Sequence, residues 1–235
     1  MKIKKISAIA VLAFSLLLCS FNKAPNNNPK NDDMEFLNTS WGMSPEEVKS
    51  ALSLKDDDIT HEEIGRMDAF IRMRDYNKKI FGYKPDDVIL TFLDVWDGIK
   101  RLCDVDIKYS SDVDMQKVLN NMKNEFGNPI SNIKEYQPFK TVITNKLRFI
   151  SYDDSETLKL WGTSKIADVI SEDKILEYQK VWGNYQSILN EDNWEDFSQN
   201  ARLTTVIWSA DVSVESAIYM NGYNGLIYDY INDNN

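Results

Sequence analysis

The side chains that most often carry out enzyme chemistry are scarce in this sequence. His61 is the only histidine, and no Gly-x-Ser-x-Gly motif is present. A serine or cysteine hydrolase needs a histidine beside its nucleophile, and a zinc site needs a set of His and Cys ligands. The sequence therefore predicts neither mechanism, and we assign no catalytic residue, no metal ligand and no cofactor.

Carboxylates, in contrast, are abundant, with 37 Asp and Glu residues in a chain of 235. Because a carboxylate pair is sufficient for glycoside hydrolysis, a glycan hydrolase stays open as an alternative. The densest acidic cluster surrounds His61 and consists of Asp56, Asp57, Asp58, Glu62 and Glu63. It lacks the glycine and the alternating spacing of an EF-hand loop, which favours a solvated acidic loop over a cation site.

The N-terminus predicts export. Lys2, Lys4 and Lys5 precede an apolar run over residues 6–18, the order typical of a secretory signal. That run is shorter than the roughly 20 apolar residues that a transmembrane helix needs. We therefore expect residues 1–19 to form a signal peptide that directs the chain to the cell envelope, periplasm or exterior.

Cys19 is a candidate lipidation site. Leu16-Leu17-Leu18-Cys19 resembles the lipobox of bacterial lipoproteins, in which the cysteine becomes the diacylated first residue. A lipobox usually has a small residue before the cysteine, where this chain has Leu18. Two routes stay open: a lipid anchor at Cys19, and ordinary cleavage near Ser20 or Ala24.

The rest of the chain divides by composition. Residues 20–33 are mostly Asn, Pro, Lys and Asp and predict a disordered tether. Residues 34–130 are predicted to form a helix-sheet-helix unit, and residues 131–235 a second sheet and helix portion packed with it. The net charge of −10 argues against a nucleic-acid partner, because phosphate binding depends on clustered Lys and Arg.

The clearest local signal is a helix start at Trp41-Gly42-Met43-Ser44-Pro45-Glu46-Glu47-Val48. Ser44 is predicted to be the N-cap, Pro45 fits the first helical position, and Glu47 can complete a capping box. A second helix is predicted from a cap at Ser111 to Gly127. A third is predicted from Ser171 onward, and Trp161-Gly162-Thr163-Ser164 echoes the first helix start, which raises the alternative of two related units.

Alternation of apolar and polar residues predicts the strands. In the first half they cover residues 69–74, 88–93 and 99–109, with a hairpin at Asp97-Gly98. In the last of these, Cys103, Val105 and Ile107 share one parity, so Cys103 is predicted to face inward as a small core residue. In the second half we expect a hairpin over residues 141–150 and strands at 157–161, 203–209, 214–220 and 226–231. Together these predict an α+β fold with helices packed on one face of an antiparallel sheet.

Aromatic residues in the second half have two interpretations. An apolar stripe at helical spacing comprises Ile175, Tyr178, Trp182, Tyr185 and Leu189. Such a stripe is usually core, although Trp and Tyr also dominate protein-binding and sugar-stacking faces. Trp194 and Phe197 lie in a polar segment with little around them to bury them, so they are our candidate interface residues.

The first helix start, the following sheet and the helix ending at Glu125-Phe126-Gly127-Asn128-Pro129 resemble a group of exported bacterial proteins and lipoproteins. These share a Trp-Gly-Met-Ser/Thr-x-Glu-Glu-Val helix start, and their outline is similar to β-lactamase-inhibitor-protein-like domains and small lipoproteins of the outer-membrane assembly machinery. The resemblance covers residues 36–129, and residues 203–230 are a further candidate region for it. It implies a non-enzymatic envelope protein that binds other proteins, and it supplies no catalytic residue.

The sequence therefore favours a non-catalytic binding or assembly module, with a protein partner in the envelope and contact with the membrane through a lipid anchor at Cys19. Capture of a small lipid or sugar is the alternative, and the glycan hydrolase is the less favoured one.

Overall fold

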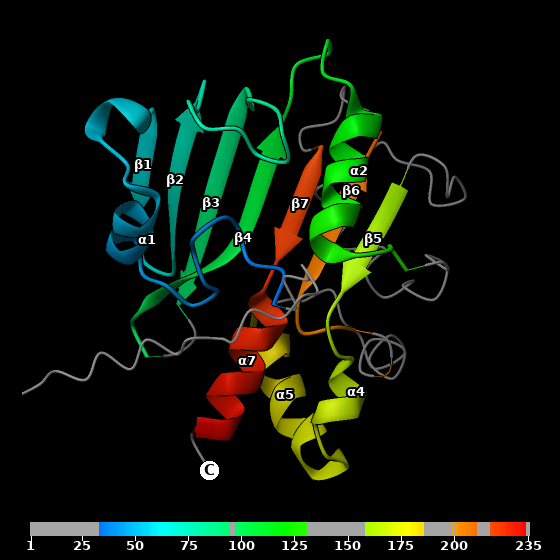
Figure 1. The fold of residues 1–235 in the computed structure, drawn as a ribbon. Helices are drawn as coiled ribbons and strands as arrows, with labels where there is room; N and C mark the ends of the chain where they lie inside the picture. Colours follow the sequence, from blue (N-terminus) through cyan, green and yellow to red (C-terminus); the bar gives the residue numbers. More distant parts are fainter. Residues whose placement is uncertain are drawn as a thin grey trace, which may run out of the picture.

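An antiparallel sheet forms the centre of the structure, which is a computed structural model describing residues 33–94, 97–130, 158–185, 199, 201–210 and 217–233. Its seven strands lie in the order β1-β2-β3-β4-β7-β6-β5 (Figure 1). They are β1 (His61–Ile64), β2 (Asp68–Arg74), β3 (Asp87–Asp94), β4 (Lys100–Lys108), β5 (Leu158–Gly162), β6 (Thr205–Ser209) and β7 (Ile218–Asn221). The predicted α+β fold on an antiparallel sheet is confirmed.

The two halves of the chain share this one sheet. Strands β1 to β4 come from the first half and β5 to β7 from the second, and they meet where β4 pairs with β7. The backbone amide of Ala217 donates to Ile107 O over 2.9 Å, and that of Gly222 donates to Cys103 O over 2.8 Å. Hydrogen bonding is therefore continuous across the boundary that composition had suggested.

The helices form two groups that contribute to different buried clusters. They are α1 (Pro45–Leu52), α2 (Met115–Phe126), α4 (Ile166–Val169), α5 (Glu172–Tyr185) and α7 (Tyr223–Asp233), with a short 3-10 helix η1 (Asp56–Asp58) after α1. The buried side chains of α1 and α2 join the larger core cluster, as expected for helices on one face. Those of α4, α5 and α7 join a second cluster, and these three helices gather at one end of the strands (Figure 1).

The start of α1 is as predicted. The backbone amide of Ser44 donates to Glu47 Oε2 over 2.8 Å, and the amide of Glu47 donates to Ser44 Oγ over 3.3 Å. These two bonds form the capping box, with Pro45 in the first turn. Val48 and Leu52 are buried one turn apart, so the apolar stripe faces the sheet.

The predicted start of α2 at Ser111 is wrong by one turn. The N-cap is Asp114, whose carboxylate accepts hydrogen bonds from the amides of Gln116 and Lys117. A carboxylate closer to the apolar stripe competes successfully with the upstream hydroxyl, because only the cap next to the helix reaches its second and third amides. The end of the helix at Gly127 is as predicted.

A bulge in β4 overturns part of the predicted alternation. Thr91 pairs with Asp104 and Phe92 pairs with Leu102, so Cys103 is an extra residue in the ladder. As a result Leu102 joins the cluster of Val105 and Ile107, while Cys103 belongs to the second cluster on the opposite face. Cys103 is buried, as predicted, but it does not share a face with Val105.

The opposite face of β4 carries two carboxylates, and these are also largely buried. Asp104 and Asp106 are each only 8% exposed. The hydroxyl of Tyr219 on β7 donates to Asp104 Oδ1 over 2.7 Å, so the carboxylate is hydrogen-bonded within the sheet. Burial and the neighbouring carboxylates raise the pKa of Tyr219, which keeps its hydroxyl protonated as the donor.

The segment predicted as a last strand, residues 226–231, lies in helix α7. Its buried residues Tyr223, Leu226, Ile227 and Ile231 recur at steps of three and four, which is the period of a helix and not that of a strand. Gly222 connects β7 to α7, and its carbonyl accepts a hydrogen bond from the amide of Leu226 over 3.2 Å. Strand β7 is accordingly the last strand among the described residues.

The predicted strands at 69–74, 88–93 and 203–209 correspond to β2, β3 and β6 with shifted ends, and the described parts of those at 157–161 and 214–220 lie in or next to β5 and β7. Strand β1 was not predicted, because His61–Ile64 carries too little apolar signal and is exposed throughout. The signal peptide, residues 20–32 of the tether and the hairpin at 141–150 lie outside the described residues. Within the described part of the chain, no helix has the length and hydropathy needed to cross a membrane.

Candidate functional site

Three residues selected from the sequence, Cys19, Trp194 and Phe197, lie outside the described residues. Of the aromatic stripe on α5, Tyr178 is fully buried and its hydroxyl donates to Asn224 Oδ1 on α7 over 2.8 Å, so the core interpretation is confirmed for it. The acidic cluster around His61 forms η1 and the exposed strand β1. Among the residues that the structure describes, no group of three or more His, Cys, Asp or Glu is placed to hold a metal ion.

The Trp-Gly-Met-Ser segment before α1 is bound to the bulge of β4. The amide of Gly42 donates to Leu102 O over 3.0 Å, and the amide of Leu102 donates to Met43 O over 2.8 Å. Gly42 has φ of 91°, a conformation that favours glycine. The segment therefore has a structural role, and it also places the indole of Trp41 beside the start of α7.

The Trp41 ring is held by two further contacts. Its Nε1 donates to Asp33 O over 3.1 Å. The ring also packs directly on the backbone of Gly222, where an added Cβ would lie only 2.2 Å from Cδ2 of the indole. Trp41 is thus fixed in position before any ligand arrives.

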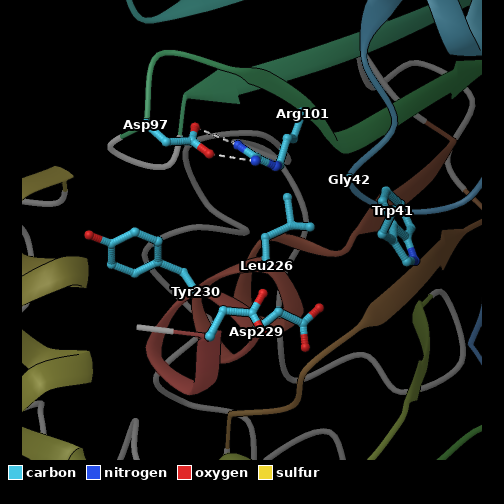
Figure 2. A pocket seen from close by; sticks show the side chains of 8 residues that line it. Trp41, Gly42, Asp97, Arg101, Leu226, Asp229 and Tyr230 are labelled. Carbon is cyan, nitrogen blue, oxygen red and sulfur yellow. Dashed lines mark hydrogen bonds and ion pairs between the residues drawn. The ribbon is translucent and has the colours of Figure 1, made fainter. Parts of the chain in front are cut away.

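A pocket of about 390 Å³ opens beside this tryptophan (Figure 2). Three separate segments line it: the Trp-Gly pair before α1, the β3-β4 hairpin with the start of β4, and one side of α7. The described lining residues are Trp41, Gly42, Asp97, Arg101, Leu226, Asp229, Tyr230 and Asp233. Its volume is in the lower part of the range found for small-molecule sites.

The hairpin side of the pocket carries an ion pair. Arg101 donates from Nη1 to Asp97 Oδ1 over 2.6 Å and from Nη2 to Asp97 Oδ2 over 2.5 Å. This two-pronged pair lowers the pKa of Asp97, chiefly through the hydrogen bonds from Arg101. The guanidinium is thereby neutralised locally and is a weak attractor for an anionic ligand.

The helix side of the pocket carries uncompensated negative charge. Asp229 and Asp233 are one turn apart on α7, and neither pairs with a basic residue that the structure describes. Partial burial, with the neighbouring Asp233 as a second cause, raises the pKa of Asp229. The pocket therefore has one cation and three carboxylates, and two of the carboxylates lack a counter-charge within the described residues.

The pocket combines these charges with apolar walls. In the view of Figure 2, Leu226 lies between Asp229 and Arg101, and the rings of Trp41 and Tyr230 lie to either side. Its described lining includes no histidine, serine, threonine or cysteine. Such a lining can bind a ligand through charge and ring contacts, and the carboxylates and the Tyr230 hydroxyl are its only described groups of the kind that serve as acid, base or nucleophile.

Sequence reasoning missed this site. Trp41 was recognised only as part of a helix start, and Asp97 only as part of a turn. Asp229, Tyr230 and Asp233 were placed in or near a strand, where Tyr230 would face away from the two aspartates. A helical period over residues 226–231 would have put Asp229 and Asp233 one turn apart.

Comparison of the sequence with protein-family models and with curated proteins, and of the structure with solved structures, finds no match. The resemblance to exported lipoproteins and assembly domains therefore stays a prediction.

Proposed function

We propose that this chain is an exported, non-catalytic binding module that docks a protein partner of the cell envelope at the pocket between α7 and the β3-β4 hairpin. The observation that carries the proposal is the composition of that pocket. A pre-positioned tryptophan, a tyrosine and two carboxylates without a basic partner among the described residues form a recognition surface that lacks a described histidine, serine or cysteine. The N-terminal signal pattern supports the envelope as the place where the partner is met.

The mode of attachment follows from the same N-terminal pattern. In this proposal Cys19 is acylated, and the Asn- and Pro-rich stretch that follows holds the folded part away from the membrane. Mass analysis of the mature N-terminus tests this directly. A chain that begins at a diacylated Cys19 supports the anchor, whereas one that begins near Ser20 or Ala24 supports export without it, and one that retains residues 1–19 contradicts export.

Site-specific photo-crosslinking in intact cells tests partner binding. Benzoylphenylalanine at position 230 replaces one aromatic side chain by another at the pocket. The matched control carries it at position 84, an exposed site in the turn before β3, at the other end of the strand from the β3-β4 hairpin. We expect a discrete crosslinked product at 230 that is absent at 84. Equal products at both positions, or none at either, would contradict a partner site at the pocket.

Capture of a small molecule is the second candidate, because a volume of about 390 Å³ is sufficient for a sugar or a short chain. Native mass spectrometry of the protein purified from its own cells tests it. A stoichiometric adduct that is lost on replacing Tyr230 would favour ligand capture. An adduct-free protein that crosslinks at position 230 would favour the protein partner.

A further inference from the structure

We propose that the group recognised in this pocket is an organic cation, an ammonium or guanidinium carried on a short aliphatic chain. The inference deepens the proposed function and rests on it, since it names what the docking site binds. We assign the cation to a lysine or arginine side chain of the protein partner, and binding of a free diamine with the same chemistry is an outcome of the test.

The charge distribution selects a cation. Asp97 and Arg101 satisfy each other in a two-pronged ion pair, so the only described basic group of the pocket is already occupied. Asp229 and Asp233 are left one turn apart on the same side of α7, where like charges repel. An ammonium or guanidinium between them removes that repulsion, and an anion would increase it.

The shape and the walls select an organic cation over a metal ion. Among the described residues no cluster of carboxylates converges closely enough to hold a metal. The pocket is much larger than a bare ion, and its walls include two aromatic rings and Leu226. Aromatic faces attract cations, and Leu226 offers apolar contact to the methylene groups that carry the charge.

The walls of the pocket are held in place by contacts within the protein, without a ligand. The Trp41 ring is fixed by its bond to Asp33 O and by Gly222 beneath it. Helix α7 is fixed through Asn224, whose Nδ2 donates to Arg202 O over 2.8 Å and whose Oδ1 accepts from Tyr178. A ligand therefore meets walls that need little ordering, which lowers the entropic cost of binding.

The test is calorimetric titration of the full mature chain with four probes. Cadaverine and N-acetyl-lysine methylamide carry the cation, N-acetyl-norleucine methylamide has a similar aliphatic chain without it, and glucose represents a neutral sugar. We expect both cations to bind, the norleucine analogue and glucose to give no heat of binding, and affinity to fall with added salt.

Two double variants locate the binding. The double variant Asp229→Asn with Asp233→Asn is expected to bind the cations about tenfold more weakly, because it removes two partly exposed charge contacts. Asp56→Asn with Asp57→Asn removes the same charge from exposed positions on η1 and is expected to leave affinity unchanged. All four sites are exposed, so circular dichroism should show both variants folded.

The outcomes separate the inference from the proposed function. Three results would overturn the inference that the pocket binds an organic cation. They are absence of cation binding, equal weakening of binding in both double variants, and binding of glucose or the norleucine analogue. If the crosslink at position 230 persists in that case, a protein partner still docks there through other chemistry. Cadaverine binding as tightly as the lysine derivative identifies a free amine as a sufficient ligand, and binding of the lysine derivative alone identifies a protein side chain.

Discussion

Position 222 requires glycine, because the Trp41 ring occupies the space where a Cβ would project. Its neighbour Gly225 is within α7 and has room for a methyl group, with Leu203 O at 3.6 Å from the added Cβ. The two glycines are therefore a matched pair for measuring how tightly the Trp-Gly segment is packed against the helix.

We predict that Gly222→Ala lowers the free energy of unfolding by about 1–3 kcal/mol, the usual cost of overpacking. Gly225→Ala should be neutral or stabilising by up to about 1 kcal/mol, since alanine is the better helix residue. Urea unfolding measures both. Replacing Trp41 by leucine should make Gly222→Ala less costly, and equal effects of the two alanine substitutions would contradict the packing described here.

Asp97 and Asp229 are predicted to have opposite effects on how the free energy of unfolding depends on pH. Arg101 lowers the folded-state pKa of Asp97, so its contribution is complete above the unfolded-state value and is lost as the pH falls through the folded pKa. Partial desolvation, with Asp233 as a second cause, raises the folded-state pKa of Asp229 although its side chain lies at the surface. Its ionisation therefore opposes folding increasingly as the pH rises from the unfolded-state pKa to the folded-state pKa.

The free energy of unfolding measured between about pH 2 and pH 7 tests both directions, because each aspartate titrates in the region around the ordinary Asp pKa of about 3.9. Asp97→Asn should lose stability at pH 7 and approach the unsubstituted protein in acid. Asp229→Asn should gain stability at pH 7 and lose that gain in acid. The same direction of change for both variants at pH 7 would refute this assignment.

At the scale of elements, caps and bulges decide where the sequence prediction succeeded. The capping box of α1 depends on four consecutive residues, so local sequence was sufficient to find it. The start of α2 depends on which of several polar residues is nearest to the buried stripe. The bulge at Cys103 depends on the pairing of β4 with β3, which no local pattern records.

The start of α2 gives a direct comparison of the two candidate caps. We predict that Asp114→Ala costs about 1 kcal/mol of unfolding free energy, because its carboxylate accepts from the amides of Gln116 and Lys117. Ser111→Ala should cost close to nothing, since Ser111 is exposed and outside the helix. Urea unfolding of both variants checks this, and the reverse order would place the cap where the sequence had suggested.

At the scale of the whole molecule, the central fact is that both halves complete one sheet. Strand β4 is a central strand only because β7 pairs with it, and Cys103 is buried in the cluster that includes Tyr219 and α7. The pocket also requires both halves, since its walls come from residues before α1, from the β3-β4 hairpin and from α7. Local periodicity could not predict that long-range arrangement, although it did identify most of the strands.

This dependence predicts a difference in thiol reactivity. In the full chain with Cys19→Ser, Cys103 should react with a thiol reagent only on unfolding, because its side chain is fully buried. In a fragment of residues 34–130 the second half is missing, so Cys103 should react rapidly. Equal protection in the fragment would show that the first half forms its own complete core.

The pocket between α7 and the β3-β4 hairpin is the proposed docking site for a partner with a basic side chain. Mass spectrometry of the peptide crosslinked to position 230 in intact cells tests this most directly. We predict a peptide from an envelope protein with a lysine or arginine beside the crosslink, and its loss when Asp229 and Asp233 are both replaced by asparagine. A crosslink that survives this double replacement and joins a peptide without basic residues would contradict the claim.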